Sequence, residues 1–124
     1  MSDQLFIGID SGTQGSKGVV FSREKGQILA EAYSEHQLIE NIGGRKEQEP
    51  AWWIEACTTV FDRLLKQPGV SGDRIRAIGV SGQQHGMVPL DASGNVISPA
   101  KLWCDTETSP QCDQITEEIG GHEK

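Results

Sequence analysis

The residues between Asp10 and Lys17 carry groups that could hold a phosphate chain and its metal ion. The stretch supplies one carboxylate, the hydroxyls of two serines and a threonine, and a lysine. Charged and hydroxyl donors bind phosphate oxygens, and successive backbone N–H groups form anion-binding concavities. Gly12 and Gly15 can adopt positive φ angles and let another group approach the backbone closely. The stretch is therefore a candidate phosphate loop with a carboxylate on its metal side.

The segments on either side must position this loop. Residues 5–9 form a short apolar run with β-branched side chains, which predicts a strand buried on both faces, and residues 17–21 predict a second strand. The spacing does not match a Walker loop, and a Rossmann motif would have to open a helix. Two interpretations stay open: a phosphate-binding hairpin of the form D-x-G-T-x-x-x-K, and an ordinary hairpin whose glycines only make the turn.

A second polar cluster, with the sequence S-G-Q-Q-H-G at 81–86, follows a predicted strand over 75–81. A helix precedes this strand, so the crossover predicts that it runs parallel to an earlier strand. Gln84 and His85 then stand at a carboxyl end, as Asp10 does, and open α/β sheets bind ligands there. Amides and an imidazole suit a ligand with several hydroxyls, although His85 could instead only support the turn. A serine-hydrolase elbow is nearly matched here, but no triad partners follow in order.

The remaining segments predict an α/β fold with a mixed sheet and helical cover. A third strand over 27–38 alternates weakly, as an edge strand does, and 41–49 is a polar loop. The first three strands lack intervening helices, so the sheet opens as an antiparallel β-meander. A strand over 87–90 and a short helix over 111–119 are also expected. A helix beginning near Pro50 has apolar residues at spacings of three and four, which predicts one buried face. That face consists of Trp53, Cys57, Val60, Phe61, Leu64 and Leu65.

Composition narrows the classes of partner. The chain has 124 residues, a net charge of −7 and a pI of about 4.8, which argues against a nucleic-acid partner. No segment is long and apolar enough for a membrane span, and the N-terminus lacks the basic region of a signal peptide. A cytoplasmic location is therefore expected. Three cysteines without a C-x-x-C pair indicate reduced thiols and no zinc site, and His36 is expected to be solvated.

Four segments, taken in order, resemble the FGGY family of carbohydrate kinases. They are I-G-I-D-S-G-T at 7–13, Glu49-Pro50 with Trp52-Trp53, the cluster at 81–86, and P-A-K-L-W-C-D at 99–105. The resemblance implies the ribonuclease-H-like fold of the actin/hexokinase superfamily. It also implies ATP and Mg²⁺ as cofactors and a small sugar as the substrate. The form of the 81–86 cluster is most similar to that of the members that phosphorylate D-xylulose, because glycerol-phosphorylating members carry Arg-Glu in place of Gln84-His85.

The resemblance also implies roles for individual residues. Asp10 would hold Mg²⁺, through a water molecule. The loop around the ATP phosphates would comprise Gly12, Thr13, Gln14, Gly15 and Lys17. Sugar hydroxyls would contact Gln84 and His85, and Trp103 would form a wall against the sugar carbons. Asp105 would either contact the substrate or only brace its loop. Many members carry an arginine two residues beyond this aspartate, where this chain has Glu107.

The resemblance places residues 1–124 in the N-terminal portion of the first of two domains. The catalytic base, most of the adenine site and the second domain would lie outside this chain, so the chain alone is expected to be inactive. A homodimer is one option for the full-length enzyme. Three alternatives stay open: an FGGY kinase for glycerol, ribulose or gluconate, a non-kinase ATPase of the same superfamily, and a domain that binds sugar without chemistry.

Overall fold

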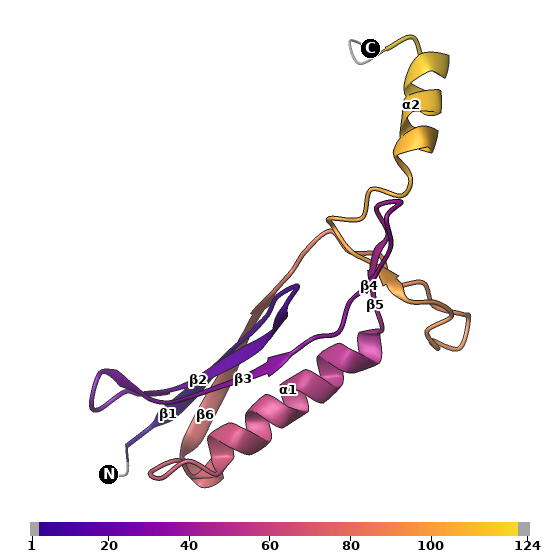
Figure 1. Cartoon of the computed structure of the whole chain (residues 1–124). Coiled ribbons are helices and arrows are strands. Elements are labelled where there is room, and N and C mark those ends of the chain that lie inside the picture. Colours follow the sequence, from indigo (N-terminus) through magenta and orange to yellow (C-terminus); the bar gives the residue numbers. More distant parts are fainter. Residues whose placement is uncertain (1–2, 122–124) are drawn as a thin grey trace.

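The fold is built around a four-stranded mixed sheet (Figure 1). The computed structural model describes residues 3–121. The strands follow the order β3-β2-β1-β6. β1 (Leu5–Ser11), β2 (Gly15–Ser22) and β3 (Gln27–Glu35) are antiparallel neighbours, and β6 (Ile75–Gly82) runs parallel to β1. The predicted antiparallel meander and parallel crossover strand are therefore confirmed.

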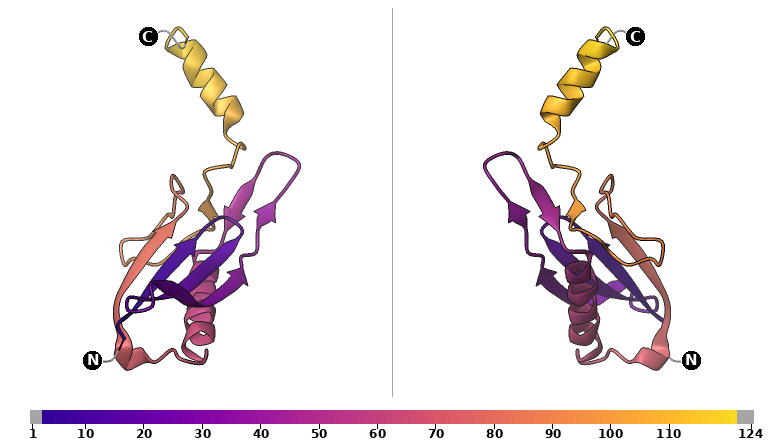
Figure 2. Two further views of the ribbon diagram at one scale, coloured as in Figure 1. Left: turned by 90° about the vertical axis from the view of Figure 1, so that its left-hand side faces the viewer. Right: turned by 90° about the vertical axis from the view of Figure 1, so that its right-hand side faces the viewer.

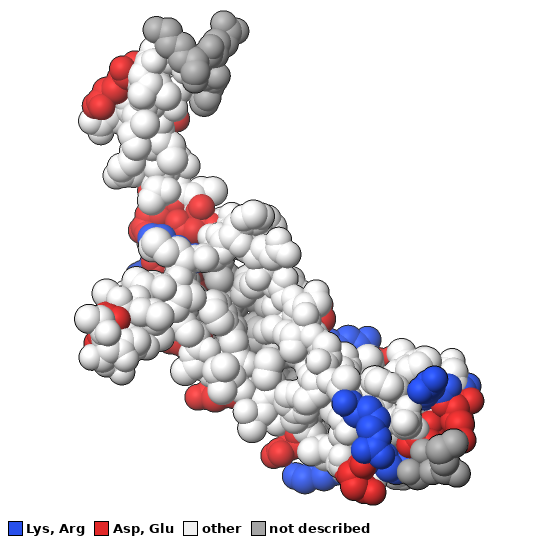
Figure 3. Space-filling view, turned by 180° about the vertical axis from the view of Figure 1, so that it is seen from behind, with Lys and Arg blue, Asp and Glu red and all other residues white. Residues whose placement is uncertain are grey.

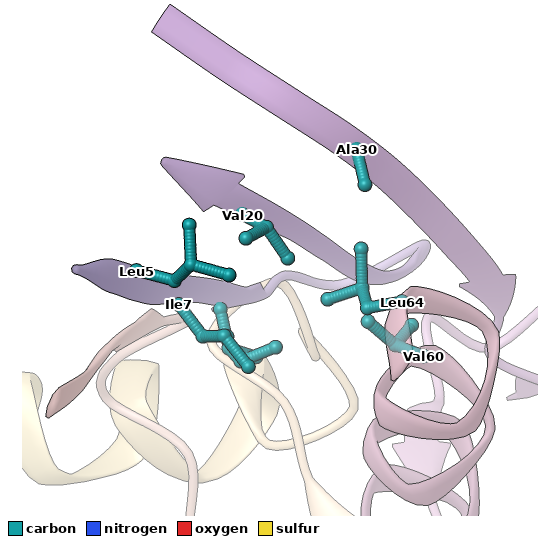
Figure 4. Packing of buried hydrophobic residues seen from close by; sticks show 7 residues of the cluster. Leu5, Ile7, Val20, Ala30, Val60 and Leu64 are labelled. Carbon is teal, nitrogen blue, oxygen red and sulfur yellow. The ribbon is translucent and has the colours of Figure 1, made fainter. Parts of the chain in front are cut away.

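One long helix, α1 (Pro50–Leu65), covers one face of this sheet (Figure 2). Val60 and Leu64 of the helix face Leu5 and Val20 of the strands in Figure 4, and all four side chains are fully buried. Each buried side chain of this kind stabilises the fold by roughly 1.5–3 kcal/mol. The helix lies close to β2 at Gly18, where a Cβ would stand 2.4 Å from Cγ1 of Val60.

The helix begins at Pro50 as predicted, with proline in the first turn. It ends at Leu65, shortly before Gly69, whose φ is 81°. Its buried face includes Val60 and Leu64 as expected, together with Ala56. The prediction is wrong for Leu65, which is 44% exposed. Successive helical residues point about 100° apart, so the neighbour of a fully buried residue turns away from the sheet.

β1 is buried on one face only among the described residues. Leu5, Ile7 and Ile9 are buried beneath α1, whereas Phe6 and Gly8, which alternate with them, are only half-buried. The prediction of a strand buried on both faces is therefore wrong for the second face, which no element within residues 3–121 covers. β6 forms the free edge beside β1, and its Ile78 and Val80 are 53% and 76% exposed.

A second, smaller sheet joins β4 (Ile39–Glu40), β5 (Lys46–Gln48) and β7 (Ala100–Lys101) in antiparallel order. The third strand of the main sheet is an edge strand as predicted, but it ends at Glu35 rather than at position 38. The predicted loop over 41–49 is wrong at its end, because Glu47 and Gln48 pair with Lys101 and Ala100 from far along the chain. The three polar residues of β5 are too few to show the alternation of apolar and polar residues that identifies a strand, so this pairing could not be predicted from the sequence.

The segment after β6 contains no regular strand before β7. The strand predicted over 87–90 is wrong, since Met87 and Leu90 form only isolated bridges, to Lys101 and Val96. A turn follows Leu90, in which Asp91 accepts hydrogen bonds from the N–H groups of Ser93 and Asn95. The described residues also form two short helices, η1 (Gly72–Arg74) before β6 and α2 (Ser109–Glu118) after β7. α2 starts two positions earlier than predicted and projects away from both sheets (Figure 1).

Charged side chains are unevenly spread over the face drawn in Figure 3. The middle of this face carries few of them, whereas lysine, arginine and acidic residues gather at the end where β1 begins. Among the described residues, no helix has the length and apolar character needed to cross a bilayer.

Candidate functional site

The candidate phosphate loop is the tight turn of the β1–β2 hairpin. Asp10 pairs with Lys17 and Ser11 with Ser16 at the end of the ladder, and the N–H of Gly12 donates to the carbonyl of Gly15 over 3.0 Å. Neither glycine adopts a positive φ. Gly15 is instead required by a close approach, because a Cβ there would lie 2.6 Å from the backbone carbonyl oxygen of Ser34. The turn therefore presents its backbone and the exposed Asp10 carboxylate beside it.

The second polar cluster lies beside this turn, as the parallel crossover predicts. Ser11 pairs with Gly82, and the N–H of Gln83 donates to the carbonyl of Ser11 over 3.0 Å. A Cβ at Gly82 would lie 2.8 Å from that carbonyl oxygen, so only glycine fits. His85 has a φ of 60°, a left-handed conformation that few non-glycine residues adopt. Such conformations gather at functional sites and turns.

Two adjoining pockets collect most of the residues that the sequence singles out. The first is lined by Asp10, Gly12, Thr13, Gly82, Gln83, Gln84, His85 and Trp103. The second shares Asp10, Gly12, Thr13 and Trp103 with the first and adds Gln14, Gly15, Lys17 and Tyr33. Asp10 and the hairpin turn therefore lie between the two pockets, one beside His85 and the other beside Lys17 and Tyr33.

Trp103 closes the site from the small-sheet side of the molecule. Its indole N–H donates to the hydroxyl of Thr13 over 3.0 Å, although the two residues lie 90 positions apart. The side chain is 60% exposed, so its ring remains available to a ligand. Lys17, on β2, forms an ion pair with Glu31 of β3 at 3.1 Å, and more than half of each side chain is exposed. An exposed pair of this kind is weak enough to be exchanged for a phosphate.

Asp105 stands apart from both pockets. Its carboxylate accepts hydrogen bonds from the N–H groups of Lys46 and Glu107, over 2.8 and 3.1 Å, and from the ammonium of Lys101 over 3.3 Å. Burial alone would raise the pKa of this carboxyl, but these donors outweigh it and hold the pKa below the ordinary value. The contacts favour the bracing role over substrate contact.

Lys101 supplies the positive charge beside Asp105. Its ammonium contacts Glu47 at 3.0 Å and Glu107 at 2.9 Å as well as Asp105, and these carboxylates raise its pKa. The three carboxylates lie close enough together to share a cation, but Lys101 already contacts all three, and Arg45 also pairs with Glu47 at 2.6 Å. The cluster ties β5 to β7 behind the site.

His36 is a residue whose place the sequence did not indicate. Its Nε2 lies 3.0 Å from the hydroxyl of Ser16, which in turn lies 3.0 Å from that of Ser11, and its Nδ1 is buried without a hydrogen-bond partner. Burial lowers the pKa of the imidazole, and the nearby carbonyls of Gly12 and Thr13 only partly oppose this effect. The prediction that His36 is solvated is therefore wrong, because the ring supports the hairpin turn from its inner side.

Sequence comparison agrees with this geometry. The model for the N-terminal domain of the FGGY family of carbohydrate kinases matches residues 5–124. The chain belongs to the FGGY family. The xylulose kinase of Haemophilus influenzae is 44% identical over 121 residues, which cover 94% of this chain and 24% of that protein. The chain therefore spans about a quarter of the length of such an FGGY relative.

Solved structures of FGGY kinases superpose on this fold. A xyloylose kinase from Brucella ovis matches with a TM-score of 0.81 and 32% identity, over 94% of this chain and 24% of that one. A gluconate kinase from Lactobacillus acidophilus matches with a TM-score of 0.79 and 27% identity, over 96% of this chain and 23% of that one. The predicted family and the actin/hexokinase-type, ribonuclease-H-like fold are both confirmed.

Proposed function

We propose that this chain is the N-terminal part of an ATP-dependent sugar kinase whose substrate is D-xylulose. The observation that carries the proposal is the pocket in which the hairpin turn at Thr13 lies beside Gln84 and His85. Catalysis of phosphoryl transfer rests on holding donor and acceptor in line and on stabilising charge. A phosphate loop that shares a pocket with hydroxyl-binding groups meets the first need. The 44% identity to a xylulose kinase supports the choice of sugar.

On the phosphate side, the hairpin turn from Gly12 to Lys17 would receive the ATP phosphates. Its backbone N–H groups and the Thr13 hydroxyl are donors, and Lys17 is free to leave its weak pair with Glu31. Asp10 fits a divalent cation, because its carboxylate is exposed, lines both pockets and offers the oxygen donor that Mg²⁺ prefers. Bound Mg²⁺ would neutralise charge on the phosphate oxygens. Asp10 would hold it through water.

On the sugar side, Gln84 and His85 would contact the hydroxyls. The amide offers both donors and an acceptor, and the imidazole offers one of each when neutral. Trp103 would cover the apolar carbons of the sugar with its exposed ring, which its hydrogen bond to Thr13 holds in place. Asp105 would brace this wall from behind rather than contact the sugar.

The proposed reaction needs parts outside this chain. A general base would take the proton from the attacking sugar hydroxyl, and a second domain would complete the adenine site and exclude water. We place these parts in the remaining three-quarters of the family length. We also propose a cytoplasmic enzyme without nucleic-acid or membrane partners, in keeping with the net charge of −7, and a homodimer as the assembly to test.

The test is a coupled ADP-release assay on the full-length protein with D-xylulose, ribulose, glycerol and gluconate. We expect D-xylulose to give the highest kcat/KM, by about tenfold or more, because a site built to pair hydroxyls rejects ligands that leave its polar groups unpaired. A preference for gluconate, ribulose or glycerol would assign a different FGGY kinase. ATP hydrolysis that no sugar stimulates would assign the ATPase class instead.

A further inference from the structure

Gln48 of β5 is a buried polar side chain with every hydrogen-bonding position occupied. It is fully buried. Its Nε2 donates to the carbonyls of Thr13 and Gln37, each over 2.8 Å. Its Oε1 accepts from the indole N–H of Trp53 over 2.8 Å and from Nε2 of Gln83 over 3.2 Å. An indole nitrogen can only donate, so the orientation of the Gln48 amide is fixed.

These bonds close a ring that spans both halves of the site. Gln83 donates to Gln48, while its own Oε1 accepts from the hydroxyl of Thr13 over 3.2 Å. The carbonyl of the same Thr13 accepts from Gln48. The ring therefore joins the hairpin turn, the loop after β6 and β5, and Trp53 attaches the start of α1 to it through Gln48. Trp103 is connected to it through the Thr13 hydroxyl.

We propose that Gln48 is a positioning residue that fixes the hairpin turn relative to the Gln84-His85 loop. The inference rests on the proposed sugar-kinase function, in which those two elements hold the phosphate donor and the acceptor hydroxyl. Gln48 itself lines neither of the two adjoining pockets. Its effect on catalysis is to set the distance between two groups that do contact substrate, and misplacement by about 1 Å can cost a hundredfold in rate.

Two substitutions of Gln48 differ in how their effect depends on pH. Gln48→Leu keeps the approximate volume but leaves the Thr13 carbonyl and the Trp53 N–H without partners at every pH. Gln48→Glu keeps the shape but places an acceptor against two carbonyls when ionised. One carboxylate oxygen would keep the donors Trp53 and Gln83, but burial and the two carbonyls that face the other oxygen disfavour the charged form and raise the pKa of the carboxyl. Acidification then protonates it and returns one donor to the ring. The variant should therefore recover as the pH falls, whereas the leucine variant should not.

The experiment uses the full-length kinase, with kcat and both KM values measured between about pH 5.5 and 8.5. At pH 8, we expect Gln48→Glu and Gln48→Leu to lower kcat by about tenfold to a hundredfold. We expect both KM values to change less than kcat. Only Gln48→Glu should regain kcat toward low pH. Gln27→Glu and Gln27→Leu, at an exposed position of β3, make the same changes outside the ring and should match wild type.

Melting temperatures of the Gln48 variants show which of them are folded, so that a loss of kcat in a folded variant can be attributed to positioning and not to loss of the fold. Folded Gln48 variants with wild-type kcat, or a Gln48→Glu variant without low-pH recovery, would overturn the proposal. If neither Gln48 variant folds, Trp53→Phe decides, because it removes a single donor to Oε1. A smaller loss of kcat in that variant supports the proposal, and an unchanged kcat rejects it. A wild-type enzyme that phosphorylates no sugar would instead refute the proposed function.

Discussion

Asp10 is the exposed carboxylate at the end of β1, directly beside the hairpin turn. In the full-length enzyme, we predict that Asp10→Asn lowers kcat and kcat/KM together by about tenfold or more, because a metal ion stabilises charge that develops in the transition state. Steady-state kinetics at saturating Mg²⁺ measure this. Asp113→Asn, at an exposed position of α2, is the matched control. A rise in the sugar KM alone would remove Asp10 from the metal side.

His85 combines a site-facing imidazole with a left-handed backbone, and the two contributions need separate tests. We predict that His85→Ala lowers kcat/KM for the sugar by roughly tenfold to a hundredfold, the equivalent of a lost bond of about 1–3 kcal/mol. The KM for ATP should barely change. Alanine also strains a backbone with a φ of 60°, whereas glycine does not.

His85→Gly therefore removes the ring without that strain and should show the same loss for the sugar. His85→Asn retains a polar side chain that tolerates the left-handed conformation, and it should be the mildest of the three variants. If His85→Gly keeps the sugar kcat/KM of wild type while His85→Ala lowers the melting temperature, the residue only supports the turn.

His36 should make stability sensitive to mild acid. Burial lowers its pKa in the folded state below the ordinary 6.5, so the unfolded chain binds the proton more readily. The neutral ring thus contributes stability above about pH 6.5, and this contribution is lost as the pH falls through the lowered pKa. Urea unfolding of wild type and His36→Gln at pH 7.5 and 5.5 measures this. Wild type should lose more stability between them, and equal losses would show that His36 does not titrate there.

At the scale of elements, the contact between α1 and β2 depends on Gly18. A Cβ there would overlap Val60 and would also lie 2.9 Å from both Ile9 Cδ1 and Leu64 Cδ1. We predict that Gly18→Ala destabilises the fold by about 1–3 kcal/mol, the usual cost of overpacking. Gly72→Ala is the matched control, since open space surrounds that position. Urea unfolding measures both, and a Gly18→Ala variant as stable as Gly72→Ala would contradict the packing described here.

The local sequence predicted the elements whose apolar residues form a run or recur at helical spacing. The apolar runs of β1, β2 and β6 and the spacing along α1 identify a meander, a crossover and a covering helix, and the carboxyl-end rule brings Asp10 near His85. β5 and β7 could not be found in this way, because each is a short segment that becomes a strand only through its distant partner. The same reason hid His36 and Gln48, which are polar residues in polar stretches and are buried by contacts from elsewhere.

At the scale of the whole molecule, we predict that these 124 residues alone transfer no phosphate to D-xylulose. The chain offers a candidate phosphate hairpin and sugar loop but spans about a quarter of the length of its family relatives. Coupled ADP release by the purified chain, compared with the full-length enzyme, measures this. A vector-only purification controls for host kinases. Sugar-dependent turnover above that control would show that the base lies within this chain.

The free edge of β6 has a consequence for how such a kinase is made. Its backbone is unpaired on one side within the described residues, and Ile78 and Val80 are exposed beside it. If synthesis continues to the full family length at roughly 5–20 residues per second, the edge of β6 stays exposed on the nascent chain for tens of seconds before the later segments are made. Exposed strand edges recruit other chains. Nascent-chain chaperones should therefore bind this region during translation, and overexpression of the early segment should favour inclusion bodies.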